Sequence, residues 1–328
     1  MEMYRSGHNG AHSKCVCRGT DTGVRIPPSP PENHYTHPMR NNQGCVFFFL
    51  QDCFGITFKY DIIKKGEKML GAIIGDLAGS IYEFDQFTQH SKVKIKSIIE
   101  DNSFFSDDTI LTVAIADAII NNKTYETTLK EYAIKYGNKI PQNIPYFKTM
   151  FSPGFTEWAK GNYQGQSSGN GAMMRVSPVG YLFNTEKDVI KNSHQATIPS
   201  HNTKDALYAA QIIALIIFYA RKGMTKQDII NKLNLRIVEP NIKEFNYTCS
   251  DTIDLCLYSF FNSNSFEESI RLAISFGGDT DTNACIVGSM AEAMFGISKE
   301  LKEKALAKLP TEFVEILNKC YKKFNGCV

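Results

Sequence analysis

The sequence carries no excess of charge of either sign. Its 36 Lys and Arg residues oppose 34 Asp and Glu residues, which leaves a formal net charge of +2 over 328 residues. Proteins that bind nucleic acid or an anionic membrane through their overall field carry a strong basic excess. We therefore expect no direct nucleic-acid partner and no membrane partner.

Long hydrophobic runs and a disulfide pattern are also lacking. The longest apolar stretch, residues 206–220, includes Gln211, whereas a membrane-spanning helix needs about 20 apolar residues. The N-terminus has no apolar core of a signal peptide. Nine cysteines are an odd number without framework spacing, which favours a reducing compartment. The expected location is the cytoplasm.

The alternation of apolar and polar residues that is typical of β-strands is scarce, and no internal repeat is evident. Apolar residues at helical spacing dominate from Met69 onward, and 43% of the chain is hydrophobic, which suffices for a sizeable core. The spacing predicts one helix after Asp281 and others over residues 69–81, 110–120, 125–136, 187–196, 203–221, 225–233, 251–262, 266–276, 299–308 and 311–324. The predicted fold is all-α, a single compact domain over residues 69–328.

Residues 1–68 differ in composition from the rest of the chain. They hold four of the nine Cys and four of the seven His residues, a proline-rich run and no helical periodicity. Cys15, Cys17, His34 and His37 suggest zinc, but the gap between the two cysteines is too short for a usual zinc knuckle. We expect these residues to form a disordered or non-native extension.

The segment just before Met69 suggests an origin for that extension. Residues 64–68 can be encoded by purine-only codons ahead of an ATG, which is what a bacterial ribosome-binding site looks like when it is read through as protein. We therefore hypothesise that translation begins at Met69 and that residues 1–68 are absent from the native protein.

Two acidic motifs, far apart in the sequence, each open an apolar helix. Gly277–Thr282 reads Gly-Gly-Asp-Thr-Asp-Thr, and Ser106–Thr109 reads Ser-Asp-Asp-Thr. One interpretation is an ordinary helix start, because acidic and hydroxyl side chains satisfy the free N–H groups of a first turn. The recurrence of the pattern favours a functional interpretation, in which both motifs supply carboxylates to one site.

The predicted first helix carries polar side chains on one face. Asp76, Ser80 and Glu83 follow the i, i+4, i+7 spacing. Such a stripe is ordinarily a solvated surface. The small residues between Gly71 and Gly79 instead allow another backbone to approach closely, which favours a crowded site.

A glycine-rich loop, residues 165–178, lies between the acidic motifs in the sequence. Gly169, Asn170 and Gly171 permit positive φ and place N–H groups where a phosphate or a ribose could approach, although an ordinary turn explains the cluster equally well. Arg175 either clamps an anion or pairs with a core carboxylate.

The tripeptide Ser200-His201-Asn202 precedes another apolar helix. Ser200 or Asn202 is expected to cap that helix, because both side chains offer an oxygen to its free N–H groups. The residue types alone favour a surface position for His201.

Taken in order, these motifs resemble the ADP-ribosylglycohydrolase family. The resemblance covers residues 69–297, excludes residues 1–68, and is carried by residues 69–84, 106–109, 169–175, 200–201 and 277–282. It implies an orthogonal all-α fold with a binuclear magnesium centre, in which manganese serves in some members. The implied reaction is hydrolysis of the glycosidic bond between ADP-ribose and another group.

The resemblance also implies roles for individual residues. The matching metal-ligand positions are Ser106, Asp107, Asp108, Asp279, Asp281 and Thr282. The matching substrate positions are Gly169, Asn170, Gly171, Arg175 and His201. The candidate catalytic carboxylates are Glu83, Asp107, Asp108 and Asp281, with Glu83 as a base or gate. Ser106 stands where many relatives have Thr, and the loop has Ala172–Met174 where small residues are common.

The residue types agree with this chemistry independently. Five carboxylates in one cleft repel one another, and two divalent cations relieve that repulsion. Carboxylate and hydroxyl oxygens favour Mg²⁺, with Mn²⁺ as an alternative, over zinc. Water activated by a metal or by a carboxylate then attacks the anomeric carbon, and the identity of the base stays open.

The expected substrate is an ADP-ribosylated protein or a small ADP-ribose conjugate, and the motifs leave open whether arginine, serine or an acetyl ester departs. One alternative is a catalytically silent ADP-ribose-binding or lens-crystallin-like protein, a class that should have lost ligands. Another is a two-metal phosphohydrolase, which normally supplies histidine ligands. The complete acidic set favours the hydrolase, which we expect to be a monomer.

Overall fold

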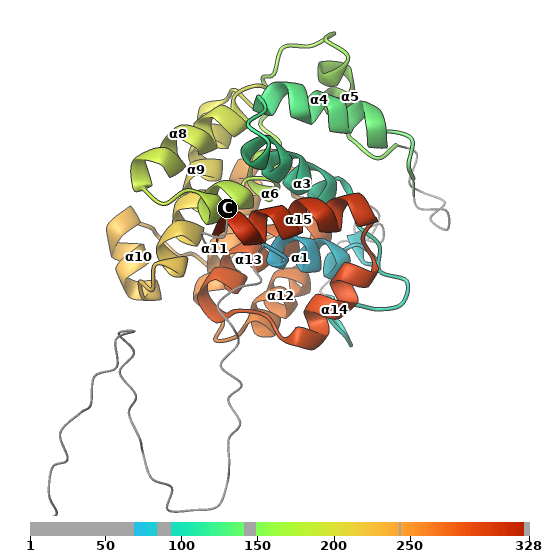
Figure 1. The fold of residues 1–328 in the computed structure, drawn as a ribbon. Coiled ribbons are helices and arrows are strands. Elements are labelled where there is room, and N and C mark those ends of the chain that lie inside the picture. Colours follow the sequence, from blue (N-terminus) through green and yellow to red (C-terminus); the bar gives the residue numbers. More distant parts are fainter. Residues whose placement is uncertain (1–68, 84–92, 141–148, 243, 325–328) are drawn as a thin grey trace, which may run out of the picture. The chain divides into compact units, whose positions relative to one another are not determined.

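Two helices packed backbone against backbone organise the structure. The computed structural model describes residues 69–83, 93–140, 149–242 and 244–324, all within one compact unit. Helix α1 (Gly71–Gly79) crosses α13 (Thr280–Phe295) near the centre of Figure 1. A Cβ atom on Gly75 would lie 2.0 Å from the Ala284 carbonyl oxygen. Only glycine permits this approach, which confirms the close backbone packing predicted for the first helix.

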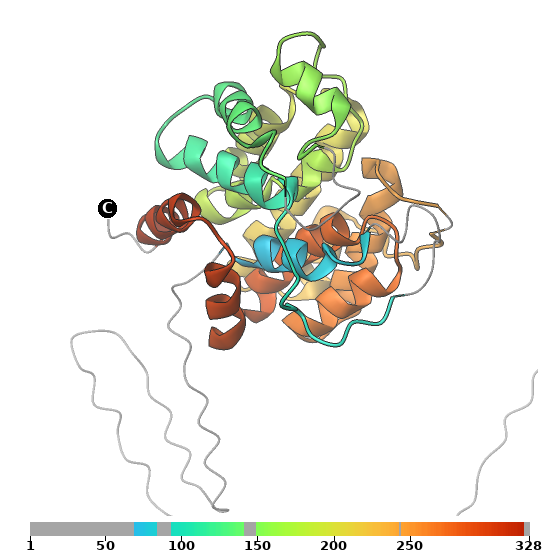
Figure 2. The ribbon, with the colours of Figure 1, turned by 90° about the vertical axis from the view of Figure 1, so that its right-hand side faces the viewer.

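The other helices surround this pair, as Figures 1 and 2 show. They are α3 (Asp107–Ile120), α4 (Tyr125–Tyr136), α5 (Pro153–Ala159), α6 (Gly171–Met174), α7 (Ser177–Leu182), α8 (Glu186–Thr197), α9 (Lys204–Arg221), α10 (Lys226–Leu233), α11 (Cys249–Phe261), α12 (Phe266–Ser275), α14 (Lys299–Ala307) and α15 (Thr311–Phe324). Helices α9, α11 and α12 pack on α13, and α3 packs on α1. Within the described ranges the β-type pairing consists of two isolated bridges, so the all-α prediction is confirmed.

Local chemistry sets most of the helix starts. Threonine or serine occupies the N-cap of α4, α8, α9, α10, α11, α12 and α14, and each side chain accepts a backbone N–H from the third residue that follows. The predicted bounds of α4 and α15 agree with the structure. The cap of α9 is Thr203, so the prediction of Ser200 or Asn202 is wrong. Ser200 instead binds side chains of the pocket.

Three short helices fall where the sequence predicted none. Helices α6 and α7 lie in and just after the segment predicted as a glycine-rich loop, and α5 precedes it. Seven residues or fewer are too short to show a period, and α5 and α7 carry proline in their first turn, which is compatible with a helix start. Gly169 and Gly171 do not use positive φ. The missing side chain of Gly171 instead leaves room for the His201 ring.

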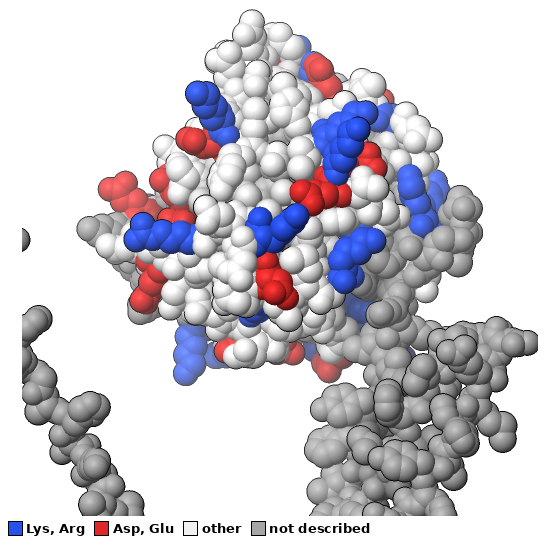
Figure 3. Space-filling view, turned by 90° about the vertical axis from the view of Figure 1, so that its left-hand side faces the viewer, with Lys and Arg blue, Asp and Glu red and all other residues white. Residues whose placement is uncertain are grey.

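The described surface and core agree with the composition. Cys249, Cys256, Cys285 and Cys320 are free and buried. On the face turned to the viewer in Figure 3, the described Lys and Arg side chains are interspersed with Asp and Glu. None of the helices in the described ranges has the length and the hydropathy needed to cross a membrane.

The predictions for residues 1–68, including the zinc reading of Cys15, Cys17, His34 and His37, lie outside the described residues.

Candidate active site

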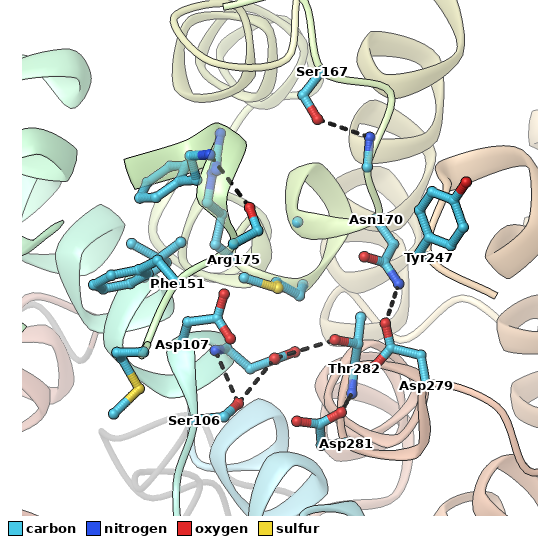
Figure 4. Close-up of a pocket in the computed structure, with 18 of the residues that line it drawn as sticks. Ser106, Asp107, Phe151, Ser167, Asn170, Arg175, Tyr247, Asp279, Asp281 and Thr282 are labelled. Atoms are coloured by element: carbon cyan, nitrogen blue, oxygen red, sulfur yellow. Dashed lines mark hydrogen bonds between the residues drawn. The ribbon is translucent and has the colours of Figure 1, made fainter. Parts of the chain in front are cut away.

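A pocket of about 580 Å³ collects every residue that the sequence singled out for the site. The lining residues among those predictions are Glu83, Ser106, Asp107, Asp108, Gly169, Asn170, Gly171, Arg175, His201, Asp279, Asp281 and Thr282. Figure 4 shows Asp107 and Ser106 on one wall, Asp279, Asp281 and Thr282 on another, and Asn170 above them. The two acidic motifs therefore meet in space, although the individual roles of these residues stay predictions.

A buried carboxylate of α1 holds the start of α3. The Asp76 carboxylate accepts the backbone N–H groups of Ser106, at 2.9 Å, and Thr109, at 3.1 Å, and the hydroxyl groups of both residues. The Ser106 hydroxyl accepts the Asp108 N–H at 3.3 Å. Because these bonds satisfy the first turn, the carboxylates of Asp107 and Asp108 are left to the pocket.

The start of α13 is built differently. Gly277 and Gly278 adopt φ of 73° and 76°, a region that favours glycine, and turn the chain into the helix. Asp279 occupies the N-cap position without a side-chain capping bond. Asp281 accepts the Thr282 N–H at 2.8 Å, and the Thr282 hydroxyl donates to Asp108 across the pocket at 3.2 Å. The prediction of an ordinary helix start is therefore correct for the backbone of this motif. It does not account for the side chains, which take part in the acidic cluster.

The carboxylates form two groups that share one member. Oxygen atoms of Asp76, Asp108 and Asp281 lie within 4.8 Å of one another, as do those of Glu83, Asp279 and Asp281. The Oδ1 atom of Asp108 is buried and accepts no hydrogen bond from any described residue. A buried carboxylate oxygen without a donor is costly unless a cation binds it. Since all the atoms that could bind a metal here are oxygens, the residues fit hard divalent ions.

Burial and mutual repulsion shift the titration of this cluster. Burial, followed by repulsion from Asp281, raises the pKa of Asp76 to about 7 and that of Asp107 to about 8. The same two causes raise the pKa values of Glu83, Asp108 and Asp279 well above their ordinary range. The cluster therefore holds protons near pH 7 when no cation is bound, and a bound cation displaces them.

The segment that contains Tyr247 and Cys249 holds the glycine-rich loop next to the acidic cluster through backbone hydrogen bonds. The backbone N–H of Asn170 donates to the Tyr247 carbonyl at 2.9 Å, and the N–H of Cys249 donates to the Ser168 carbonyl at 2.9 Å. The side-chain amide of Asn170 donates to Asp279 at 2.7 Å (Figure 4). One side chain of the loop therefore contacts the acidic cluster directly.

Arg175 and His201 form a buried pair at the other side of the loop. Arg175 is 1% exposed, donates to the Ser200 hydroxyl at 2.6 Å and lies 5.9 Å from the Phe155 ring. Its Nε and Nη1 atoms have no partner among the described residues. The core-carboxylate pairing that we considered for Arg175 is therefore not found in the described part of the chain. Two of its donors remain for an anion.

His201 is buried rather than on the surface, so the position that its residue type favoured is wrong. Burial, and then the charge of Arg175, holds its pKa well below the usual range, so the ring is neutral. Arg175 can only donate, and therefore Nδ1 of His201 accepts from its neighbours and the proton sits on Nε2. A Cβ on Gly171 would lie 3.3 Å from that Nε2 atom, which places a donor at the loop.

The sequence reading missed several residues of the site. Asp76 had the correct spacing, but its role as the anchor of α3 depends on a helix 30 residues away in sequence. Asn246 and the pocket-lining aromatics Phe151, Phe155 and Tyr247 belong to no motif. Only tertiary packing brings them to the loop, so no local signal could have identified them.

Comparison with known proteins identifies the family. The family model described as ADP-ribosylglycohydrolase matches residues 67–326. The chain belongs to the ADP-ribosylglycohydrolase family. The resemblance seen in the motifs is thereby confirmed, and the protein is an enzyme of this family.

Individual members of the family are distant in sequence. An ADP-ribosylarginine hydrolase Tri1 of Pseudomonas putida (strain GB-1) is 22% identical over 280 residues, which cover 75% of this chain and 72% of that protein. An ADP-ribosylhydrolase ARH3 of Danio rerio is 24% identical over 312 residues, with 70% and 82% covered. A solved ADP-ribosylglycohydrolase-related protein complex superimposes with a TM-score of 0.61 at 19% identity, and covers 79% of this chain and 96% of that one. The last likeness shows that the fold is shared.

Proposed function

We propose that the protein hydrolyses the glycosidic bond between ADP-ribose and an attached group, with two divalent cations at the acidic cluster. The observation that carries the proposal is the meeting of two oxygen clusters, joined through Asp281, with a glycine-rich loop in one pocket. The family membership supports the reaction class. The burial of Asp108 Oδ1 without a donor supports the cations.

The ions would be held by Ser106, Asp107, Asp108, Asp279, Asp281 and Thr282, with Glu83 beside them. Oxygen ligands favour Mg²⁺, and Mn²⁺ is an alternative of similar chemistry. When bound, such ions act as Lewis acids and lower the pKa of water. The two clusters share Asp281, and this supports a centre with two ions rather than one.

The protein side chains supply orientation and proton transfer. Glu83 is the candidate base or gate, and burial, followed by repulsion from Asp281, raises its pKa well above the ordinary range, so it binds a proton more strongly than an ordinary carboxylate does. Asp107 and Asp108 hold negative charge beside the sugar, where positive charge develops as the bond breaks. The backbone N–H of Gly171, the free donors of Arg175 and the Nε2–H of His201 would bind the diphosphate, whereas the N–H groups of Gly169 and Asn170 hold the loop itself.

The aromatic side chains of the pocket would hold the adenine. Phe151 and Tyr247 stand on different sides of the glycine-rich loop in Figure 4. Phe155 lies 5.4 Å from Phe151 and supports it. Flat rings stack on a purine, and this contact does not involve the group attached at the distal ribose, so the substrate can be a protein conjugate or a small ADP-ribose conjugate.

The experiment is a panel of ADP-ribose conjugates incubated with Mg²⁺, Mn²⁺ or EDTA. The conjugates are ADP-ribosyl-arginine, an ADP-ribosyl-serine peptide and O-acetyl-ADP-ribose. The arginine conjugate comes first, because a relative bears the name ADP-ribosylarginine hydrolase. We expect metal-dependent release of free ADP-ribose from at least one conjugate. Release that is unaffected by EDTA would contradict the metal centre.

The two alternative functions give different products in the same experiment. A silent ADP-ribose-binding protein would bind ADP-ribose without releasing it from any conjugate. A two-metal phosphohydrolase would release AMP or phosphate instead of ADP-ribose. Each result would replace the proposed reaction.

A further inference from the structure

A buried amide outside every sequence motif joins the two walls of the pocket. Asn246 lies in the segment before α11 and is 2% exposed. Its Oδ1 atom accepts the backbone N–H of Asp279 at 3.0 Å. Its Nδ2 atom donates to Asn283 at 2.8 Å and to Thr252 at 3.1 Å. Because the Asp279 N–H can only donate, the orientation of the amide is determined.

Asn170 closes the connection from the side of the loop. Its side-chain Nδ2 donates to the Asp279 carboxylate at 2.7 Å and lies 3.4 Å from the Asn246 carbonyl. Its backbone N–H donates to the Tyr247 carbonyl at 2.9 Å. Asp279 is therefore held at its backbone by Asn246 and at its carboxylate by the loop residue Asn170.

The contact between Asn246 and the start of α13 leaves no space for even one more carbon atom. A Cβ on Gly278 would lie 2.0 Å from Asn246 Oδ1, and Gly278 has a φ of +76°. The two segments are therefore in direct contact. A displacement of the loop at residues 168–171 would move Asn246 and Tyr247, and with them the backbone of Asp279.

We propose that Asn246 is a positioning residue that couples the acidic cluster to the glycine-rich loop. The proposal rests on the proposed function, since it assigns cations to the cluster and the adenosine phosphate to the loop. Each ligand stabilises the same arrangement of Asn170, Asp279 and Asn246. Binding of one ligand therefore raises the affinity for the other, and the effect is reciprocal.

The test measures AMP binding with and without the cation. AMP carries adenosine and one phosphate but lacks the distal ribose, so a shared contact at the sugar cannot produce the coupling. Calorimetry gives the Kd of AMP in Mg²⁺ and in EDTA. We expect Mg²⁺ to lower the Kd of AMP for the wild-type protein about fivefold or more. In Asn246→Ala this ratio of the Kd in EDTA to the Kd in Mg²⁺ should fall to less than about twofold.

Tyr181→Phe is the matched control. Tyr181 is a buried donor whose hydroxyl binds the Ser289 carbonyl, away from the pocket lining. The variant loses this buried hydrogen bond, whereas Asn246→Ala loses at least three, and it should keep the wild-type ratio of the two Kd values. If the ratio falls equally in both variants, general destabilisation explains the effect and the proposal is wrong.

Two further measurements keep the proposal testable if Asn246→Ala folds poorly. Thr252→Val removes one anchor of the Asn246 amide and should lower the ratio part-way. In the wild-type protein, AMP should strengthen Mn²⁺ binding by the same factor, measured by electron paramagnetic resonance. Equal AMP affinity in Mg²⁺ and EDTA would overturn the coupling. If conjugates are still hydrolysed, that result leaves the proposed function intact, whereas absence of all turnover contradicts the function itself.

A separate observation concerns the first described residue. Met69 is 2% exposed and has a φ of +87°, a region that non-glycine residues rarely adopt. Its nitrogen lies 3.0 Å from both carboxylate oxygens of Glu292, which also accepts the Gly71 N–H at 2.8 Å. A residue with no preceding carbonyl has no such strain. Its nitrogen would be an ammonium at neutral pH, paired with a carboxylate.

We infer that Met69 is the first residue of the native chain and that its α-ammonium group binds Glu292. The inference agrees with residues 64–68, which purine-only codons can encode. Intact-mass analysis of the protein from its native source should give a chain that begins at Met69. A native species that contains residue 1 would overturn the inference.

A thermal-unfolding cycle tests the ion pair itself. Glu292→Gln is compared in the 328-residue chain and in a chain that begins at Met69. We expect a larger decrease in Tm in the shorter chain, because there the substitution also removes the pair between Glu292 and the α-ammonium group. Equal decreases in the two chains would contradict the ion pair.

Discussion

The two helix starts that face each other in the pocket hold their carboxylates by different means. The α3 start is tied to a buried carboxylate, Asp76, through the N–H and hydroxyl groups of Ser106 and Thr109. The α13 start is tied to neutral amides, because Asn246 binds its backbone and Asn170 binds its side chain. The first arrangement adds charge to an already acidic cluster, and the second adds none.

The two helix starts should therefore respond to different changes in the pocket. The anchor of α3 titrates with the cluster, since burial raises the pKa of Asp76 to about 7. Its geometry should therefore depend on pH and on bound cations. The anchors of α13 do not titrate, so that side of the pocket should keep its geometry and transmit the state of the glycine-rich loop instead.

Removal of the shared carboxylate should have the largest effect. Asp281 belongs to both oxygen clusters, whereas Asp107 contributes from the α3 side. We expect Asp281→Asn to lower kcat/KM on the order of 10³-fold and Asp107→Asn about 10²-fold. Steady-state release of ADP-ribose in Mg²⁺ gives both values. Asp117→Asn, on α3 but outside the pocket, serves as the control and should stay near the wild-type rate.

Neutralising the α3 anchor should weaken cation binding next. Asp76→Asn keeps the shape of the side chain but presents an N–H₂ group toward N–H donors, so the turn at Ser106 loses part of its support. We expect the affinity for Mn²⁺ to fall about 10–100-fold, as is typical when a residue behind the metal ligands is changed. Calorimetric titration measures this. An unchanged Kd would mean that the turn keeps its geometry without Asp76.

The pH dependence of stability should separate the metal-free protein from the loaded one. The folded pKa values of Asp76 and Asp107, about 7 and about 8, lie above the ordinary value of 3.8. Below the ordinary value their contribution to stability is fully present, and it is lost as pH rises through about 7–8. In EDTA we expect Tm to decrease between about pH 4 and about pH 8, on the order of 5 °C more than in Mg²⁺. Parallel curves in EDTA and Mg²⁺ would contradict this reading.

On the neutral side of the pocket, at the start of α13, shape rather than charge is at stake. Gly278→Ala places a Cβ against Asn246 at a positive φ, whereas Gly161→Ala meets the same backbone penalty, at a φ of +87°, in open space. We expect Gly161→Ala to cost about 1 kcal/mol and Gly278→Ala about 1–3 kcal/mol more. Denaturant unfolding measures both. Equal costs would show that the contact with Asn246 is easily relaxed.

Much of this site could be read from the chain because its chemistry is local. Ser, Asp and Thr at a helix start are recognisable in a four-residue window, and the cap at Thr124 sets the start of α4 within a single turn, whereas the cap of α9 was assigned to the wrong residues. The recurrence of the acidic motif was sufficient to predict that carboxylates meet. The glycines of α1 indicated that a second backbone approaches, and α13 is that backbone.

Burial and long-range hydrogen bonding could not be read in this way. His201 has the sequence surroundings of a surface residue, yet the loop at Gly169–Gly171 and Arg175 enclose it. Arg175 could have paired with a carboxylate or bound an anion, and only the packed structure shows it bonded to Ser200 with two donors left over. A side chain's partners depend on which helices pack together, which local propensity does not encode.

The sequence by itself therefore determined the all-α class, most helix boundaries and which carboxylates line the pocket, because periodicity, capping and motif chemistry act within a few turns. Only the tertiary structure decided that Asp76 anchors the α3 start and that Asn246 joins the loop to Asp279. Those roles arise where segments tens of residues apart exclude water together, and a buried polar group must then find its hydrogen-bond partner in whichever segment lies beside it.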